Sequence, residues 1–124
     1  MFDHIDYVMV TVSDMKRSVQ FYRDQLGLIL RFESPEWTEF ETGRTVLALH
    51  GGGTPASSTP SLAAKAGTAS IGFEVDNLER KYADLRDKGV VFAMPPSDRG
   101  EEAIKLAICL DPDGLPISMA ERRR

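Results

Sequence analysis

Hydrophobic positions first alternate and then recur at helical spacing along YVMVTVSDMKRSVQFYRDQLG, residues 7–27. Valine occupies every second position from Val8 to Val12, which predicts a strand with one β-branched side. The apolar residues that follow are three or four positions apart, which predicts a helix with one apolar face: Met15, Val19, Tyr22 and Leu26.

The same order of residues occurs again in SIGFEVDNLERKYADLRDKG, residues 70–89. In the first copy, Ser13 or Asp14 supplies an oxygen for the free N–H groups of the helix, and Gly27 ends it. In the second copy Asp76 is the predicted N-cap. Apolar and charged positions of the two copies match at an offset of 63 residues. The sequence therefore predicts one module used twice.

Strand-like segments complete each module as a βαβββ unit. In the first module they are residues 28–34, 36–42 and 45–50. In the second module residues 68–75 form the first strand and residues 77–88 the helix, and the later strands are residues 90–94, 103–110 and 115–120. We expect Pro95 and Pro96 to break the strand at residues 90–94, with a polar turn after them.

The predicted fold class is α+β, because two such units must pack their sheets under helices to bury a core. We expect a single domain over residues 1–124, with module one at 1–50, a linker at 51–67 and module two at 68–124. The segment at 51–67 is rich in small, turn-forming residues without periodicity, so it is either a linker or a mobile loop over a site.

Composition narrows the class of protein. With 124 residues and 42% hydrophobic content, the chain can bury a core without disulfides or a structural metal. A net charge of −4 argues against nucleic acid or an anionic membrane as a partner. The sequence has no membrane-length apolar run and no signal-peptide pattern, and its single Cys109 lies in an apolar segment. We therefore expect a cytoplasmic protein with a buried, reduced cysteine.

The opening SDMKRSVQFYRDQLG and the ending DPDGLPISM make the chain resemble the vicinal oxygen chelate superfamily over nearly its whole length. This superfamily includes glyoxalase I, bleomycin-resistance proteins, fosfomycin-resistance enzymes and extradiol dioxygenases. The resemblance implies that each sheet curls into a half-barrel and that two modules enclose a cavity. It also implies a homodimer, since many members are homodimeric.

The resemblance also locates the positions at which catalytic members hold a divalent metal with His, Glu or Gln. In this chain those positions carry Tyr7, Ala48, Ser70 and Ser118. Alanine has no donor, a neutral hydroxyl is a poor ligand and tyrosine would need deprotonation. We therefore expect no metal and no cofactor. A shifted metal site that uses His50 and Glu74 is the alternative, because strand alternation places them on the sides of Ala48 and Ser70.

Strand alternation also predicts which side chains line the ligand site. The third strand carries Trp37, Glu39 and Glu41 on one side, but the sequence does not say which face of the sheet this is. Trp37 is either a stacking platform for a ligand or ordinary sheet packing. The predicted ligand-binding residues are Tyr7, Met9, Trp37, Val46, Ala48, His50, Ser70, Glu74 and Ser118.

Two functions from different classes fit this lining. The first is metal-free binding and sequestration of a small molecule in an apolar cavity. The alternative is a glyoxalase-like lyase or isomerase that acts on a small carbonyl compound. It would use His50 as the base with Tyr7 polarising an oxygen, or an atypical metal site. The sequence leaves open whether the chain is an enzyme. A degenerate member kept for partner binding is a third possibility that no residue favours.

Overall fold

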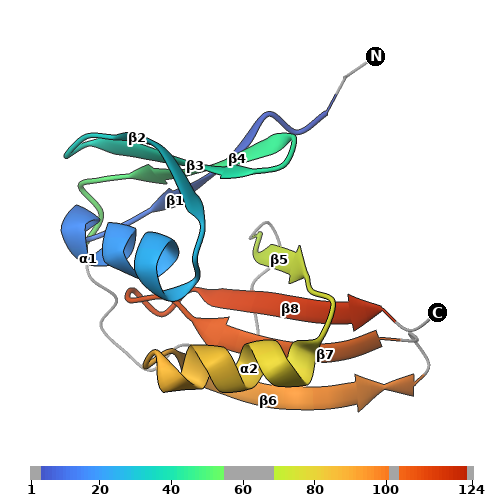
Figure 1. Cartoon of the computed structure of the whole chain (residues 1–124). Coiled ribbons are helices and arrows are strands. Elements are labelled where there is room, and N and C mark those ends of the chain that lie inside the picture. The colour runs from blue at the N-terminus through green and yellow to red at the C-terminus, as the bar shows by residue number, and fades with distance from the viewer. Residues whose placement is uncertain (1–3, 55–68, 101–103, 123–124) are drawn as a thin grey trace. The chain divides into compact units, whose positions relative to one another are not determined.

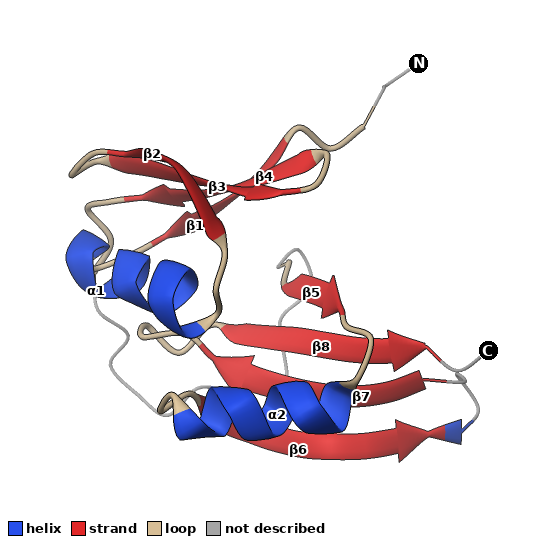
Figure 2. Ribbon diagram, in the orientation of Figure 1, coloured by secondary structure: helices blue, strands red, loops and turns tan. Residues whose placement is uncertain are grey.

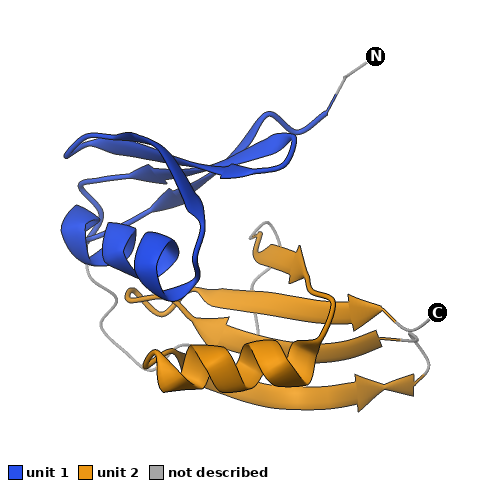
Figure 3. Ribbon diagram, in the orientation of Figure 1, with its two compact units in different colours: residues 1–56 blue, residues 57–124 orange. Residues whose placement is uncertain are grey.

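The computed structural model describes residues 4–54, 69–100 and 104–122 (Figure 1). The chain forms two compact units, residues 1–56 and residues 57–124, and each is described by itself (Figure 3). Within the described residues no helix combines the length and the apolar character needed to cross a membrane.

The first unit is a four-stranded sheet with one helix. Its strands have the order β1-β4-β3-β2, and β1 runs parallel to β4 while the other neighbours are antiparallel. The elements are β1 (Tyr7–Thr11), the α-helix α1 (Met15–Val19), the π-helix η1 (Gln20–Gln25), β2 (Ile29–Glu33), β3 (Trp37–Thr42) and β4 (Thr45–His50).

The second unit repeats this plan (Figure 2). Its strand order is β5-β8-β7-β6, again with the first strand parallel to the last. The elements are β5 (Ile71–Glu74), α2 (Leu78–Asp87), β6 (Val91–Arg99), β7 (Ile104–Leu110) and β8 (Pro116–Arg122). The predicted α+β class with two βαβββ modules is therefore confirmed.

Each helix begins after an N-cap residue whose backbone is extended and whose side chain accepts a hydrogen bond from the helix. Asp14 Oδ1 accepts a hydrogen bond from the backbone N–H of Arg17 at 3.1 Å, which decides between the two predicted caps. In the second unit the predicted cap, Asp76, is wrong. Asn77 has the extended backbone that an N-cap needs, with φ −136° and ψ 96°, and its Oδ1 accepts from Arg80 N at 3.2 Å. The two observed caps are 63 positions apart, the offset that the repeat predicts.

The two helices end in the same way, but their lengths differ by one residue. Gly27 and Gly89 follow them with positive φ angles of 82° and 86°, as expected for left-handed helix ends. From N-cap to glycine the first helix is one residue longer than the second. The extra residue is absorbed where the helix widens, since Leu26 N donates to Phe21 O, five residues back, at 2.9 Å. A π-turn is the usual result of inserting one residue into an α-helix.

Each helix covers one face of its own sheet. In the first unit the rings of Tyr22 and Phe40 lie 6.0 Å apart, and in the second the rings of Tyr82 and Phe92 lie 4.7 Å apart. Apart from Ser18 and Thr38 in the first unit, the buried side chains between each helix and its sheet are apolar, as the apolar stripes predict. They include Val12, Val19, Phe40, Leu47 and Leu49 in the first unit and Leu78, Leu85, Cys109, Ile117 and Met119 in the second.

Cys109 is fully buried in the core of the second unit, which confirms its predicted place. Removal of the thiol from water raises its pKa to about 12, with a smaller contribution from the charge of Asp111. A thiol in this state carries no thiolate nucleophile near neutral pH.

The prediction that Pro95 and Pro96 break a strand is wrong, because β6 continues through both to Arg99. The pairing with β7 shows why: Met94 faces Ile108 and Ser97 faces Leu106, so β6 has one extra residue at this place. The prolines therefore lie in a bulge of an edge strand, where a missing N–H disturbs no ladder. The predicted polar turn likewise begins inside this strand.

The start of the glycine-rich segment is tightly bonded to the first sheet. Gly51 N donates to Glu36 O at 2.9 Å and Gly53 N donates to Val12 O at 3.0 Å. A Cβ on Gly53 would lie 2.7 Å from Thr11 Cγ2, so this position leaves no room for a side chain. The remainder of the predicted linker, residues 55–67, lies outside the described residues.

Candidate functional site

The strand register decides which side chains share the face of the first sheet that points away from its helix. Residues directly opposite each other in a ladder lie on the same face. Trp37 lies opposite His50, Glu39 opposite Ala48 and Glu41 opposite Val46, while Tyr7 and Met9 pair with Val46 and Ala48. This helix-free face therefore carries Tyr7, Met9, Trp37, Glu39, Glu41, Val46, Ala48 and His50.

Three rings gather on the helix-free face around Trp37. The Tyr7 ring lies 5.9 Å from the Trp37 ring at an interplanar angle of 77°. The His50 imidazole lies 6.1 Å from it at 80°. The indole Nε1 of Trp37 donates a hydrogen bond of 2.9 Å to Glu39 Oε2. The side of Trp37, which the sequence left open, is therefore the side of Tyr7 and His50, and a carboxylate orients the indole.

Ala48 lies in the ladder between Met9 and Glu39, and its methyl group is fully buried. A small residue at this register leaves room for the large side chains on the neighbouring strands. Tyr7 and Met9 are about half exposed, at 53% and 48%. Six of the predicted ligand-binding residues share this face: Tyr7, Met9, Trp37, Val46, Ala48 and His50.

Sequence reasoning missed residues that β2 adds to this face. The β2–β3 register shifts between Leu30 and Phe32, so that Phe32 faces Glu39 and Ile29 faces Glu41. Both are exposed, Ile29 at 65% and Phe32 at 53%. Arg31, at the irregularity, places its Nε 3.6 Å from Glu39 Oε1. Strict alternation cannot find these residues, because a bulge interrupts the period of two.

Two of the three predicted ligand-binding residues of the second unit are bonded within that unit. Ser118 lies opposite Gly72, and its hydroxyl donates to Ile71 O at 3.3 Å. Ser70 precedes β5, which begins at Ile71, so the prediction that the strand includes residue 70 is wrong. Glu74 is exposed and forms a 3.0 Å ion pair with Arg122 Nε. That the residues of both modules line one cavity stays a prediction.

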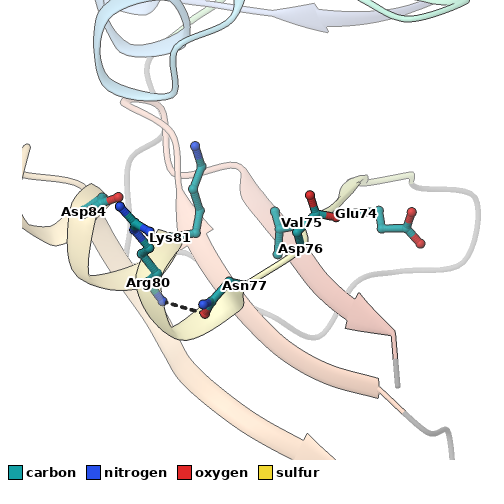
Figure 4. A pocket seen from close by; sticks show the side chains of 7 residues that line it. All are labelled: Glu74, Val75, Asp76, Asn77, Arg80, Lys81 and Asp84. Carbon is teal, nitrogen blue, oxygen red and sulfur yellow. Dashed lines mark hydrogen bonds between the residues drawn. The ribbon is translucent and has the colours of Figure 1, made fainter. Parts of the chain in front are cut away.

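The second unit also has a hollow of about 330 Å³ at the start of α2 (Figure 4). Its walls are formed by Val75, Asn77 and charged residues of both signs: Glu74, Asp76, Arg80, Lys81 and Asp84. The first N–H groups of the helix already have acceptors, because Leu78 N donates to Glu121 Oε1 at 2.8 Å and Arg80 N to Asn77 Oδ1. Because these two N–H donors are already bonded and the charged side chains have both signs, the hollow does not favour a ligand of one charge.

The residue types at the family's metal positions do not fit a divalent cation. Tyr7 is a phenol on an exposed strand, Ala48 is a methyl group without a donor, and the Ser118 hydroxyl is bonded to the backbone. Across residues 4–54, 69–100 and 104–122, no three or more His, Cys, Asp or Glu side chains are grouped so that they could hold a metal ion. The alternative ligand Glu74 already has Arg122 as an ionic partner.

The fold and this site define a small α+β protein built from paired βαβββ modules. The family model described as the Glyoxalase/Bleomycin resistance protein/Dioxygenase superfamily matches residues 4–119. The chain belongs to this superfamily, and the resemblance predicted from its sequence is confirmed.

The chain is similar in sequence to one curated protein and in fold to several solved structures. The uncharacterized protein YraH of Bacillus subtilis (strain 168) is 33% identical over 113 residues, covering 86% of this chain and 88% of YraH. A glyoxalase/dioxygenase from Nostoc punctiforme superposes with a TM-score of 0.82 at 20% identity, covering 98% of this chain and 92% of that one. TnmS3, an antibiotic binding protein from Streptomyces sp. CB03234, superposes with a TM-score of 0.77 at 22% identity, covering 98% of this chain and 97% of TnmS3. Identities this low show the shared fold alone.

Proposed function

We propose that this protein binds and sequesters a small amphipathic organic molecule without a metal, on the helix-free face of its first sheet. The observation that carries the proposal is the aromatic group of Tyr7, Trp37 and His50, held together on one face and joined to Glu39. Aromatic side chains with one or two fixed polar groups are the usual lining of small-molecule sites.

The physical basis is burial of apolar surface against a preorganised wall. A bound molecule would cover parts of Tyr7, Met9 and Phe32, which are about half exposed. Each square ångström of apolar surface removed from water contributes about 25 cal/mol, and aromatic contacts add to this. The hydrogen bond from Trp37 to Glu39 limits the rotation of the indole, so less conformational entropy is lost on binding.

The donor chemistry supports binding over metal-assisted catalysis. The methyl group of Ala48 and the bonded hydroxyl of Ser118 stand where catalytic relatives are expected to place strong ligands. The similarity to TnmS3, which is described as an antibiotic binding protein, agrees with this class of function. The similarity lies in the fold, so it names no ligand for this chain.

The test uses the single tryptophan of the chain as its reporter. Titration with a panel of flat amphipathic compounds should give a saturable change in Trp37 emission for at least one of them. Tyr7→Ala should weaken that binding several-fold, because one aromatic wall is lost. The matched control is Val8→Ala, the next residue on the same strand with its side chain on the opposite face.

Two outcomes would contradict the proposal. One is the absence of any saturable response across the panel. The other is turnover of a small carbonyl compound that disappears in both His50→Ala and Tyr7→Phe, which would establish the catalytic alternative.

A further inference from the structure

The helix-free face combines perpendicular aromatic rings with a carboxylate, and this combination points to the charge of the ligand. Resting on the proposed function above, we infer that the ligand carries a cationic nitrogen of the alkylammonium type next to its apolar body. The inference goes beyond apolar capture because it assigns the polar group of the ligand and the side chains that receive it.

The aromatic geometry forms a corner. Trp37 meets Tyr7 at 77° and His50 at 80°, with ring centroids 5.9 Å and 6.1 Å apart. Rings that meet nearly at right angles present walls in different directions to one small group. An alkylammonium group is attracted by the negative faces of such rings, and its methyl groups contact them at little desolvation cost. A neutral apolar group gains the contacts but not the electrostatic attraction.

Glu39 supplies the negative charge at this corner. Its Oε2 accepts the Trp37 indole N–H at 2.9 Å, which holds the carboxylate at the edge of the indole. The Glu39 side chain is only 28% exposed, so water screens its charge incompletely. Glu41 lies on the same face one register step away, opposite Val46. Two carboxylates therefore lie on this face, and Glu39 has the guanidinium of Arg31 as an ionic partner.

Arg31 is the competitor for the ligand's cation. Its Nε lies 3.6 Å from Glu39 Oε1, longer than the roughly 2.7–2.9 Å of a tight charge-assisted hydrogen bond. The Arg31 side chain is 54% exposed, so it can leave Glu39 and remain in water. A ligand cation that approaches Oε1 would replace a long, solvated ion pair with a shorter, partly desolvated one.

The experiment compares two probes of equal shape, choline and its neutral isostere 3,3-dimethylbutan-1-ol. Binding is followed through the indole N–H resonance of Trp37, the single tryptophan. We expect choline to bind about three- to tenfold more tightly than the neutral isostere, as a partly exposed cation–π contact with an adjacent carboxylate should give.

Variants at Glu39 and Arg31 should act in opposite directions. Glu39→Gln keeps an oxygen for the Trp37 N–H but removes the charge, so choline affinity should fall at least threefold while the neutral isostere is unaffected. Arg31→Gln removes the competitor, so choline affinity should rise about twofold or more. Glu41→Gln is the matched control on the same strand and should change choline affinity less than Glu39→Gln does.

The outcomes separate this inference from the proposed function. Equal or tighter binding of 3,3-dimethylbutan-1-ol would overturn the cationic assignment, and so would a Glu39→Gln protein that keeps the wild-type preference. If neutral aromatic compounds also fail to perturb Trp37, the proposed function fails with it. If those compounds bind and choline does not, only the cationic assignment is lost.

Discussion

The two sheets have the same topology but different chemistry on their helix-free faces. The residues that pair in equivalent places can be compared directly. Around Ala48 the first sheet carries Tyr7, Met9, Trp37, Glu39 and His50. Around Ser118, the equivalent of Ala48, the second sheet carries Gly72, Leu106, Ile108 and Ala120, with Ser70 just before it. The aromatic rings of the first face correspond to aliphatic and small side chains on the second, whose carboxylate, Glu74, lies opposite Ala120 and is paired with Arg122.

The helix-facing sides of the same sheets have not diverged in this way. Both modules retain a polar N-cap at the same offset, a positive-φ glycine after the helix and buried aliphatic side chains beneath it. Folding requires the same burial in each module, so it constrains one side of each sheet. The helix-free face is released from that requirement, so the first module can carry on it the ligand-binding surface that we propose.

The largest loss of stability should come from a cavity on the helix-facing side of the first sheet. Phe40 is fully buried and its ring contacts Tyr22, so Phe40→Ala should lower the free energy of unfolding by about 3–5 kcal/mol. Phe32→Ala, on the helix-free side at 53% exposure, is the matched control and should cost less than about 1 kcal/mol. Urea unfolding followed by circular dichroism measures both. Equal losses would show that the two sides of the first sheet are constrained alike.

Enlarging the small residue at the centre of each helix-free face should have different effects in the two modules. Ala48 is fully buried, so Ala48→Leu should destabilise the protein by about 1–3 kcal/mol through overpacking and should shift Trp37 emission. Ser118→Leu, beside Gly72 in the second module, should leave that emission unchanged. An unchanged Trp37 spectrum in Ala48→Leu would mean that this register does not position the indole.

The buried thiol of the second module should make the folded state less stable as the pH becomes alkaline. Burial raises the pKa of Cys109 to about 12 from 9.0, so the folded state keeps its proton while the unfolded state ionises. The stabilisation is complete below pH 9.0 and is lost as the pH rises toward the folded value of about 12. Across this range Cys109 should subtract about 1.4 kcal/mol per pH unit. The difference between wild type and Cys109→Ala in urea unfolding isolates the slope, and parallel curves would refute it.

The smallest effects should come from the helix caps, at which the modules are alike. Asp14→Ala and Asn77→Ala should each lower the free energy of unfolding by about 1 kcal/mol, because each removes an acceptor from the third N–H of a helix. Asp76→Ala is the control and should be nearly neutral, since Asn77 and not Asp76 caps α2. Thermal unfolding of the three variants is sufficient. A larger loss for Asp76→Ala than for Asn77→Ala would reverse the assignment of the cap.

The sequence by itself determined the repeated module, the order of its elements and the apolar side of the first strand and of the helix in each module. These features depend on residues close in the chain: valine at every second position, apolar residues at helical spacing, and a glycine after each helix. It also predicted that Cys109 is buried, which the structure confirms. That Tyr7, Ala48, Ser70 and Ser118 hold no metal stays a prediction.

Only the tertiary structure decided what depends on the pairing of distant strands. The ladder between β3 and β4 placed Trp37 beside His50, and a register shift in β2 brought Arg31 to Glu39. The bulge that accommodates Pro95 and Pro96 arises from pairing with β7, and the π-turn absorbs one residue before Gly27. Alternation tells which residues share a side of one strand, but hydrogen bonds between strands decide which of those sides come together.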